Sequence, residues 1–92
     1  YYIYYNFMYE ELEIYKKKLL YRASYRGTKE MDILLSTFVK KYINIFDKNQ
    51  MEALEKFLQF EDETILNFYN YNIIKDNINE NQISKIFKNF KI

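Results

Sequence analysis

The scarcity of helix-breaking residues constrains the fold of this chain more than any other feature. Its 92 residues contain no proline and one glycine, Gly27. Turn-rich β folds depend on these two residue types, whereas the interiors of helices tolerate them poorly. The chain is therefore predicted to be all-α, and its length is that of a single domain.

The spacing of apolar side chains predicts where the first two long helices lie. Apolar residues recur in steps of three and four, which places them on one face of a helix. The longer stripe consists of Met31, Leu34, Leu35, Phe38, Val39, Tyr42, Ile45 and Phe46. An earlier stripe of Met8, Leu12, Tyr15 and Leu19 predicts a first helix over about residues 8–24.

Polar residues predict the starts of the remaining helices. Asp47 and Gln50 have the spacing of a capping box that opens a third helix. Asp62 is predicted to cap a short fourth helix, and Asn79 with Gln82 to open a fifth. The asparagine-rich segment "NYNIIKDNIN" between the last two helices is predicted to be a connection. Together these signals predict a small compact bundle of about five helices.

The first seven residues, "YYIYYNF", differ in character from the rest of the chain. They are mostly aromatic and precede Met8, which would make a natural start. We expect residues 1–7 to be an N-terminal extension, disordered or not native, and residues 8–92 to form one helical domain. The segment lacks the charged leader of a signal peptide. No apolar run approaches the roughly 18–20 residues that cross a bilayer, so no membrane insertion is expected.

Charge and residue types exclude several classes of function. The chain has no histidine and no cysteine, so the commonest general base, the thiol nucleophile and the usual zinc ligands are missing. Carboxylates remain near Glu11 and Asp62, but solvated acids are ordinary near helix starts. The formal charge is only +1, and the basic run Lys16–Lys18 follows glutamates at helical spacing, which is typical of a solvated face. We predict no independent catalysis, no metal and no nucleic-acid partner.

The segment around Gly27 contains the most specific local pattern. Gly27 is predicted to end the first helix in a left-handed cap, and Thr28 to cap the second helix. The two arginines of the chain, Arg22 and Arg26, lie one helical turn apart just before it. A guanidinium binds carboxylates or carbonyls at two points, which suits recognition. The alternative is a surface pair of Arg26 with Glu30, worth under about 1 kcal/mol. Spacing alone leaves both open.

Residues 26–30, "RGTKE", fit the motif RGxxE. With its surroundings, "LLYRASYRGTKEMDILLSTF", this segment resembles the helix–RGxxE–helix core of the succinate dehydrogenase assembly factor family, the small flavinylation factors of bacteria and mitochondria. The resemblance extends over about residues 12–90. The chain departs from the family at Phe68, where a tryptophan is usual, and at Asn70 or Tyr71, where a glycine often follows.

The resemblance implies a five-helix protein that binds the flavoprotein subunit of succinate dehydrogenase, or its fumarate reductase relative. Such a protein promotes covalent attachment of FAD to a histidine of that subunit. By position, the partner-binding residues are Arg26, Gly27 and Glu30, with Arg22, Lys29 and Asp32 as neighbours. We expect Arg26 and Glu30 to project outward together and to contact the partner.

The resemblance also sets expectations for cofactor, assembly and location. FAD is handled on the partner, so no cofactor is expected to stay bound to this chain. The free chain is expected to be a monomer in the bacterial cytoplasm, with the mitochondrial matrix as the alternative. Other readings stay open: a generic helical adaptor with no role in flavinylation, a nucleic-acid binder, or self-association through Tyr1–Phe7.

Overall fold

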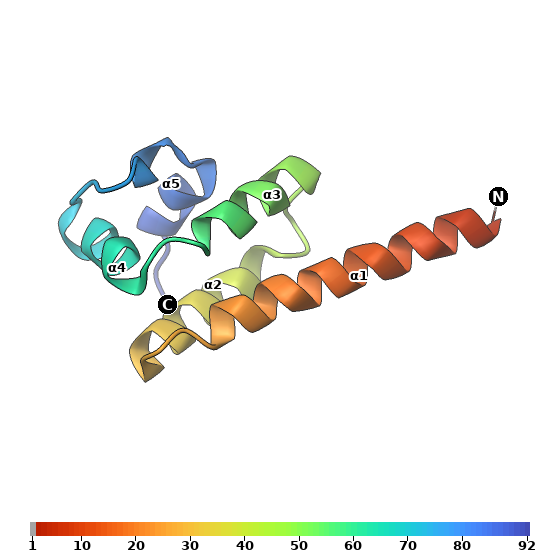
Figure 1. Cartoon of the computed structure of the whole chain (residues 1–92), viewed down its shortest axis with the longest axis horizontal. Coiled ribbons are helices and arrows are strands. Elements are labelled where there is room, and N and C mark those ends of the chain that lie inside the picture. Colours follow the sequence, from red (N-terminus) through yellow and green to blue (C-terminus); the bar gives the residue numbers. More distant parts are fainter. Residues whose placement is uncertain (1) are drawn as a thin grey trace.

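The computed structural model describes residues 2–92, with side chains from residue 10 onward. Over these residues the chain forms helices joined by turns and contains no strand, which confirms the all-α prediction. Figure 1 shows the order of the elements. The elements are α1 (Tyr2–Ser24), α2 (Lys29–Tyr42), α3 (Lys48–Phe57), α4 (Asp62–Tyr71), the 3-10 turn η1 (Ile78–Glu80) and α5 (Gln82–Lys88).

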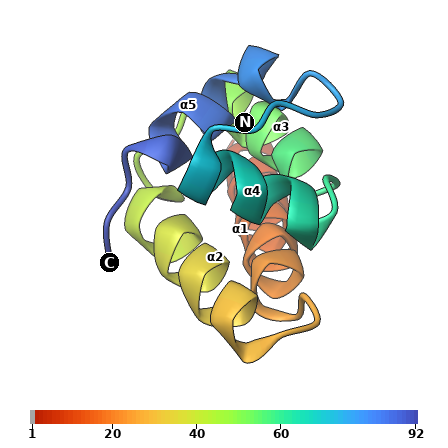
Figure 2. The same cartoon turned by 90° about the vertical axis from the view of Figure 1, so that its left-hand side faces the viewer.

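The helices form two neighbouring groups (Figures 1 and 2). Helix α2 turns back along the C-terminal half of α1, and α5 packs against α3, η1 and α4. The N-terminal half of α1 projects beyond the rest, so the molecule measures 50 × 26 × 20 Å. None of the helices over residues 2–92 combines the length and the apolar character that crossing a membrane requires.

Helix α1 begins at Tyr2, earlier than the predicted start near residue 8. Residue 1 and the side chains of residues 2–9 lie outside the described residues. The N-terminal extension over residues 1–7 and the alternative of self-association through Tyr1–Phe7 therefore remain predictions.

A cluster of aromatic rings fills the core. The Phe38 ring, fully buried on α2, lies 5.0 Å from the Phe87 ring and 5.2 Å from the Phe90 ring, measured between centroids. The apolar stripe predicted for the second helix is buried except at Tyr42, which is half-buried, and at Ile45, which is 71% exposed. This part of the prediction is wrong because α2 ends at Tyr42, and the following turn places Ile43 in the core instead.

Of the caps predicted for the last three helices, one is confirmed and two are wrong. Asp47 and Gln50 form a capping box, with the Gln50 N–H donating to Asp47 Oδ1 over 2.8 Å. The residue before α4 is Glu61, and its side chain makes no capping hydrogen bond. Asp62 instead lies in the first turn of α4, where its carboxylate has another partner. Helix α5 is capped by Asn81 rather than Asn79.

The end of α4 shows how the chain accommodates its departures from the family pattern. Phe68 is 3% exposed and fills an apolar position in the core. Asn70 and Tyr71 are both helical, and the left-handed residue is Asn72, with a φ of 57°. Asparagine adopts this conformation more readily than most residues, so the helix ends without a glycine.

Candidate functional site

The corner between α1 and α2 requires the single glycine. Gly27 has a φ of 157°, a positive value that residues with a side chain rarely adopt. This is not the left-handed helical conformation that the sequence predicted, which has a φ near +57°. Thr28 caps α2 as predicted, because its Oγ1 accepts a hydrogen bond from the Met31 N–H over 3.2 Å. Lys29 is exposed at the first position of α2.

The Arg26 guanidinium points into the protein. Its Nε donates to Asp62 Oδ1 over 2.8 Å. Its Nη1 donates to the Leu58 carbonyl over 2.7 Å, and its Nη2 to the Phe60 carbonyl over 2.8 Å. The Arg26 side chain is only 10% exposed. The prediction that Arg26 projects outward is therefore wrong, and so is the alternative of an Arg26–Glu30 surface pair.

The physical reason lies in the loop between α3 and α4. Leu58 and Phe60 belong to this loop, and their carbonyls need donors because buried backbone groups are costly to leave unpaired. A planar guanidinium supplies several donors in a fixed geometry, which a lysine cannot do. Arg26 therefore ties the α1–α2 corner to the α3–α4 loop.

Two carboxylates complete the corner. Asp32 Oδ1, in the first turn of α2, accepts a hydrogen bond from the Arg26 backbone N–H over 2.5 Å. Asp62 Oδ2 lies 3.5 Å from the position that a Cβ on Gly27 would occupy. Asp32, predicted as a lower-ranked partner-binding residue, is thus used within the corner.

Arg22 acts on a different segment from Arg26. Its Nη1 lies 3.3 Å from Glu55 Oε2 on α3, and the other Glu55 oxygen accepts from the Tyr15 hydroxyl over 2.7 Å. Burial, together with the hydrogen bond to Glu55, raises the pKa of Tyr15 to about 12. The Arg22 side chain remains 50% exposed. The two arginines therefore hold α1 to α3 and to the loop after it.

Glu30 is the acidic residue of the motif that stays available. It is exposed in the first turn of α2, and within the described residues its carboxylate makes no ion pair or hydrogen bond. Of the two side chains expected to project outward, only Glu30 does so. The corner thus combines a largely buried Arg26 side chain with an exposed Glu30 carboxylate.

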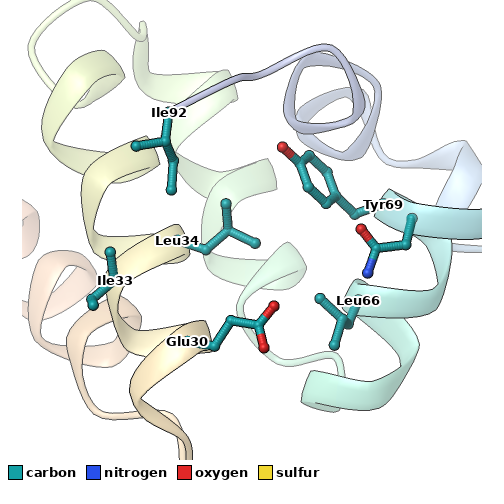
Figure 3. Close-up of a pocket in the computed structure, with 7 residues that line it drawn as sticks. Glu30, Ile33, Leu34, Leu66, Tyr69 and Ile92 are labelled. Atoms are coloured by element: carbon teal, nitrogen blue, oxygen red, sulfur yellow. The ribbon is translucent and has the colours of Figure 1, made fainter.

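Glu30 borders a hollow of about 350 Å³ between α2, α4 and the C-terminal segment. Figure 3 shows apolar side chains facing each other across it, with the Glu30 carboxylate at one end. The lining residues are Glu30, Ile33, Leu34, Leu66, Tyr69, Asn70 and Ile92. We call this hollow the α2–α4 groove. It can take an apolar side chain and, at the Glu30 end, a cation or N–H donor.

Sequence reasoning did not find the other residues of the α2–α4 groove. Ile33 is 47% exposed and lies outside the apolar stripe that predicted α2. Ile92 is 75% exposed and follows the last helix. The one sequence signal for the groove is Ile33, an isoleucine off the buried face of its helix. This signal indicates a groove only when the position of α4 opposite α2 is known.

Metal chemistry has no visible basis in the described part of the chain. Across it, no group of three carboxylate, histidine or cysteine side chains lies close enough together to hold an ion.

The basic run also differs little from the predicted solvated face. Lys17 and Lys18 are exposed, and Lys16 donates to Asn44 over 3.1 Å and lies 3.5 Å from Glu13.

Comparison with known proteins identifies relatives that share this segment. The assembly factor "Succinate dehydrogenase assembly factor 2-B, mitochondrial" of Drosophila willistoni is 45% identical over 49 residues, which is 53% of this chain and 31% of that protein. The corresponding factor 2 of Scheffersomyces stipitis is 38% identical over 53 residues, 58% of this chain and 36% of that protein. The chain thus spans about a third of the length of these curated relatives. No solved structure matches it.

A family model described as "Sdh5: Flavinator of succinate dehydrogenase" matches residues 17–91. The match includes the corner at Gly27, the exposed Glu30, and all of the α2–α4 groove except Ile92. It therefore covers most of the chain. On this evidence the chain belongs to the Sdh5 family, the flavinators of succinate dehydrogenase.

Proposed function

We propose that this chain binds the flavoprotein subunit of succinate dehydrogenase, or its fumarate reductase relative, and promotes covalent attachment of FAD to that subunit. The observation that carries the proposal is the family match over residues 17–91, which spans the corner and Glu30. The names of the relatives describe assembly factors of succinate dehydrogenase.

The residue types of the chain favour an accessory role over catalysis of its own. It contains no histidine and no cysteine, so it offers neither of the usual side chains to which a flavin is linked. The covalent bond would form on a histidine of the partner. The contribution of this chain would be to hold the partner with its flavin and histidine aligned, since alignment alone lowers a barrier by several kcal/mol. FAD would stay with the partner.

The residues of the site divide into positioning and contact roles. Arg26 is a positioning residue, because its guanidinium is engaged by Asp62 and by the α3–α4 loop. Gly27 and Lys29 are exposed beside it and leave the backbone open to close approach. Glu30 would accept from a cationic side chain or an N–H group of the partner. An apolar side chain beside that donor would enter the α2–α4 groove.

The test is co-expression of a candidate flavoprotein with variants of this chain, scored by flavin fluorescence of the partner on a denaturing gel. Glu30→Ala and Glu30→Gln are expected to reduce the flavin signal at least tenfold. Glu80→Ala is the matched control, because Glu80 is an exposed acid on η1, away from the groove. All three variants should keep the wild-type melting temperature, since none of these carboxylates is buried.

Two outcomes separate the proposal from its alternative. A partner that is fully flavinylated in the presence of Glu30→Ala would remove Glu30 from the site. A chain that binds the flavoprotein but leaves its flavin content unchanged would be a helical adaptor with no role in flavinylation.

We expect this chain to lie in the same cellular compartment as the flavoprotein that it binds. The relatives named above are mitochondrial, which favours the matrix over the bacterial cytoplasm as the location of this chain. Fractionation of the native cells, with the flavoprotein as marker, distinguishes the two. We expect neither nucleic acid nor a lipid bilayer to be a partner.

A further inference from the structure

The outward face of α1 carries a line of exposed apolar side chains. Ile14 is 54% exposed, Tyr21 64% and Tyr25 70%. The rings of Tyr21 and Tyr25 pack on each other, with centroids 4.5 Å apart. At 3.6 residues per turn these three lie on one line along the helix, opposite the buried Leu19 and Ala23. We call this line the α1 stripe.

Charged residues flank the α1 stripe in a regular order. Glu10 and Glu11 lie one turn before Ile14, and Lys17 and Lys18 lie one turn after it. The helical repeat places Glu10 and Lys17 along one side of the stripe and Glu11 and Lys18 along the other. All four are exposed, and none forms an ion pair within the described residues. The stripe therefore has an acidic half and a basic half that meet at Ile14.

We infer that a second copy of this chain packs on the α1 stripe around Ile14, with the two α1 helices antiparallel about a twofold axis at that residue. In this arrangement, residues at nearly the same distance before and after Ile14 face each other. Glu11 of one copy meets Lys18 of the other on one side of the stripe, and Glu10 meets Lys17 on the opposite side. A twofold contact is self-complementary, so every pair occurs twice.

The charge order selects this arrangement over a parallel one. Two parallel α1 helices in register would place glutamate against glutamate and lysine against lysine, which is unfavourable. The antiparallel pair neutralises both halves and removes the two Ile14 side chains from water. Access is open, because the N-terminal half of α1 projects beyond the other helices (Figure 1).

The dimer is expected to be reversible. A contact made by one helix from each copy falls at the small end of the interfaces that proteins use. Its ion pairs lie at the surface, where salt screens them. The oligomeric state should therefore depend on protein concentration and on salt, in contrast to the free monomer that the sequence led us to expect.

Charge reversal in sedimentation velocity experiments tests the arrangement directly. The full chain is expected to sediment as a dimer at low salt and to dissociate at high salt. The variants Glu10→Lys/Glu11→Lys and Lys17→Glu/Lys18→Glu should each be monomeric, because like charges then face each other in the homodimer. An equimolar mixture of the two variants should form a heterodimer, since every facing pair is again opposite in charge.

Matched controls separate this contact from a general effect of charge or exposure. Lys48→Glu/Lys56→Glu changes the net charge as much as the lysine reversal does, but on exposed positions of α3, and should remain dimeric. Ile14→Asp should abolish the dimer, whereas Ile45→Asp, at a 71% exposed isoleucine elsewhere, should not.

Three results would overturn the inference. The first is a wild-type chain that stays monomeric at low salt up to its solubility limit. The second is a dimer that survives both α1 reversals or dissociates equally with the α3 control. The third is a mixture of the two reversed variants that remains monomeric.

Discussion

The corner at Gly27 and the connection after α4 both change the direction of the chain, but different kinds of contact fix their backbone conformations. The corner uses one glycine with a φ of 157° and is tied to the distant α3–α4 loop by Arg26. The connection from Asn72 to Asn81 has no glycine and includes three side-chain-bearing residues with positive φ. These are Asn72 (57°), Asp76 (55°) and Asn77 (59°).

The difference shows whether local or distant residues determine the backbone conformation of each segment. The connection is shaped locally, since asparagine and aspartate tolerate the left-handed region and the Ile78 N–H closes a turn onto the Lys75 carbonyl over 3.1 Å. The corner is shaped by residues more than thirty positions later in the chain. Damage to the corner should therefore spread to α3 and α4, whereas changes in the connection should remain local.

The largest effect is expected for Arg26→Ala. The substitution removes a partly buried ion pair and leaves the Leu58 and Phe60 carbonyls without their donor. We expect the free energy of unfolding in urea to fall by about 2–4 kcal/mol. Arg26→Lys should recover less than half of this loss, because one ammonium cannot replace the planar fork.

Arg22→Ala is the matched control for Arg26→Ala, since Arg22 is half exposed and pairs at the surface with Glu55. Its cost should stay below about 1 kcal/mol. Equal losses for the two arginines would show that the corner is not tied to the loop as described.

The next largest effect is expected for Gly27→Ala. The nearest atom to an added Cβ is at 3.5 Å, an ordinary contact, so the cost comes from the backbone conformation rather than from a clash. We expect a loss of about 1–3 kcal/mol in the free energy of unfolding. Ser24→Ala is the control, because Ser24 is the last residue of α1 and its helical backbone conformation does not require glycine. A similar loss of stability in Ser24→Ala would contradict this explanation.

A smaller change of opposite sign is expected for Ser84→Ala on α5. The Ser84 hydroxyl is fully buried, and among the described residues it has no hydrogen-bond partner. Removing it should raise the free energy of unfolding by about 1 kcal/mol. Ser36→Ala is the control, because the Ser36 hydroxyl donates to the Ile33 carbonyl over 3.3 Å. Destabilisation by Ser84→Ala would reveal a partner for that hydroxyl.

The smallest effect is expected in the connection itself. Asn77→Gly removes the side chain from a residue with left-handed backbone conformation, which glycine adopts without a Cβ clash. It should therefore stabilise the fold by about 0.5 kcal/mol. Asn77→Ala should destabilise it by a similar amount. Introducing glycine at position 77 should thus stabilise the fold, whereas replacing Gly27 should destabilise it. Thermal melts of both sets of variants, compared as changes in melting temperature, measure this contrast.

Local patterns in the sequence were sufficient for most of the fold. The period of apolar residues predicted α2 and its buried face, and the capping box at Asp47 and Thr28 at the start of α2 were recognisable from a few neighbours. The fold class followed from the lack of proline and the single glycine. The caps act within about one helical turn, and the apolar period within one helix, where sequence and structure are closely linked.

The failures at the site have a common cause, which is contact between residues far apart in the sequence. Asp62 was predicted to cap α4, but its carboxylate receives Arg26 from 36 positions earlier. The direction of the Arg26 side chain depends equally on the Leu58 and Phe60 carbonyls, which nothing in its own segment reveals. The α2–α4 groove requires α2 and α4 to be placed opposite each other. Sequence reasoning therefore identified the motif residues and the availability of Glu30, and misjudged the role of Arg26.

The bonds of Arg26 to Leu58, Phe60 and Asp62 also bear on the order of events during synthesis. The α1–α2 hairpin emerges from the ribosome while the loop that holds its corner is still inside the exit tunnel. The hairpin can be helical by then, but its corner acquires its final geometry only after Asp62 has emerged. A nascent chain stalled before that point would display every residue of the motif and still lack the geometry of the completed corner.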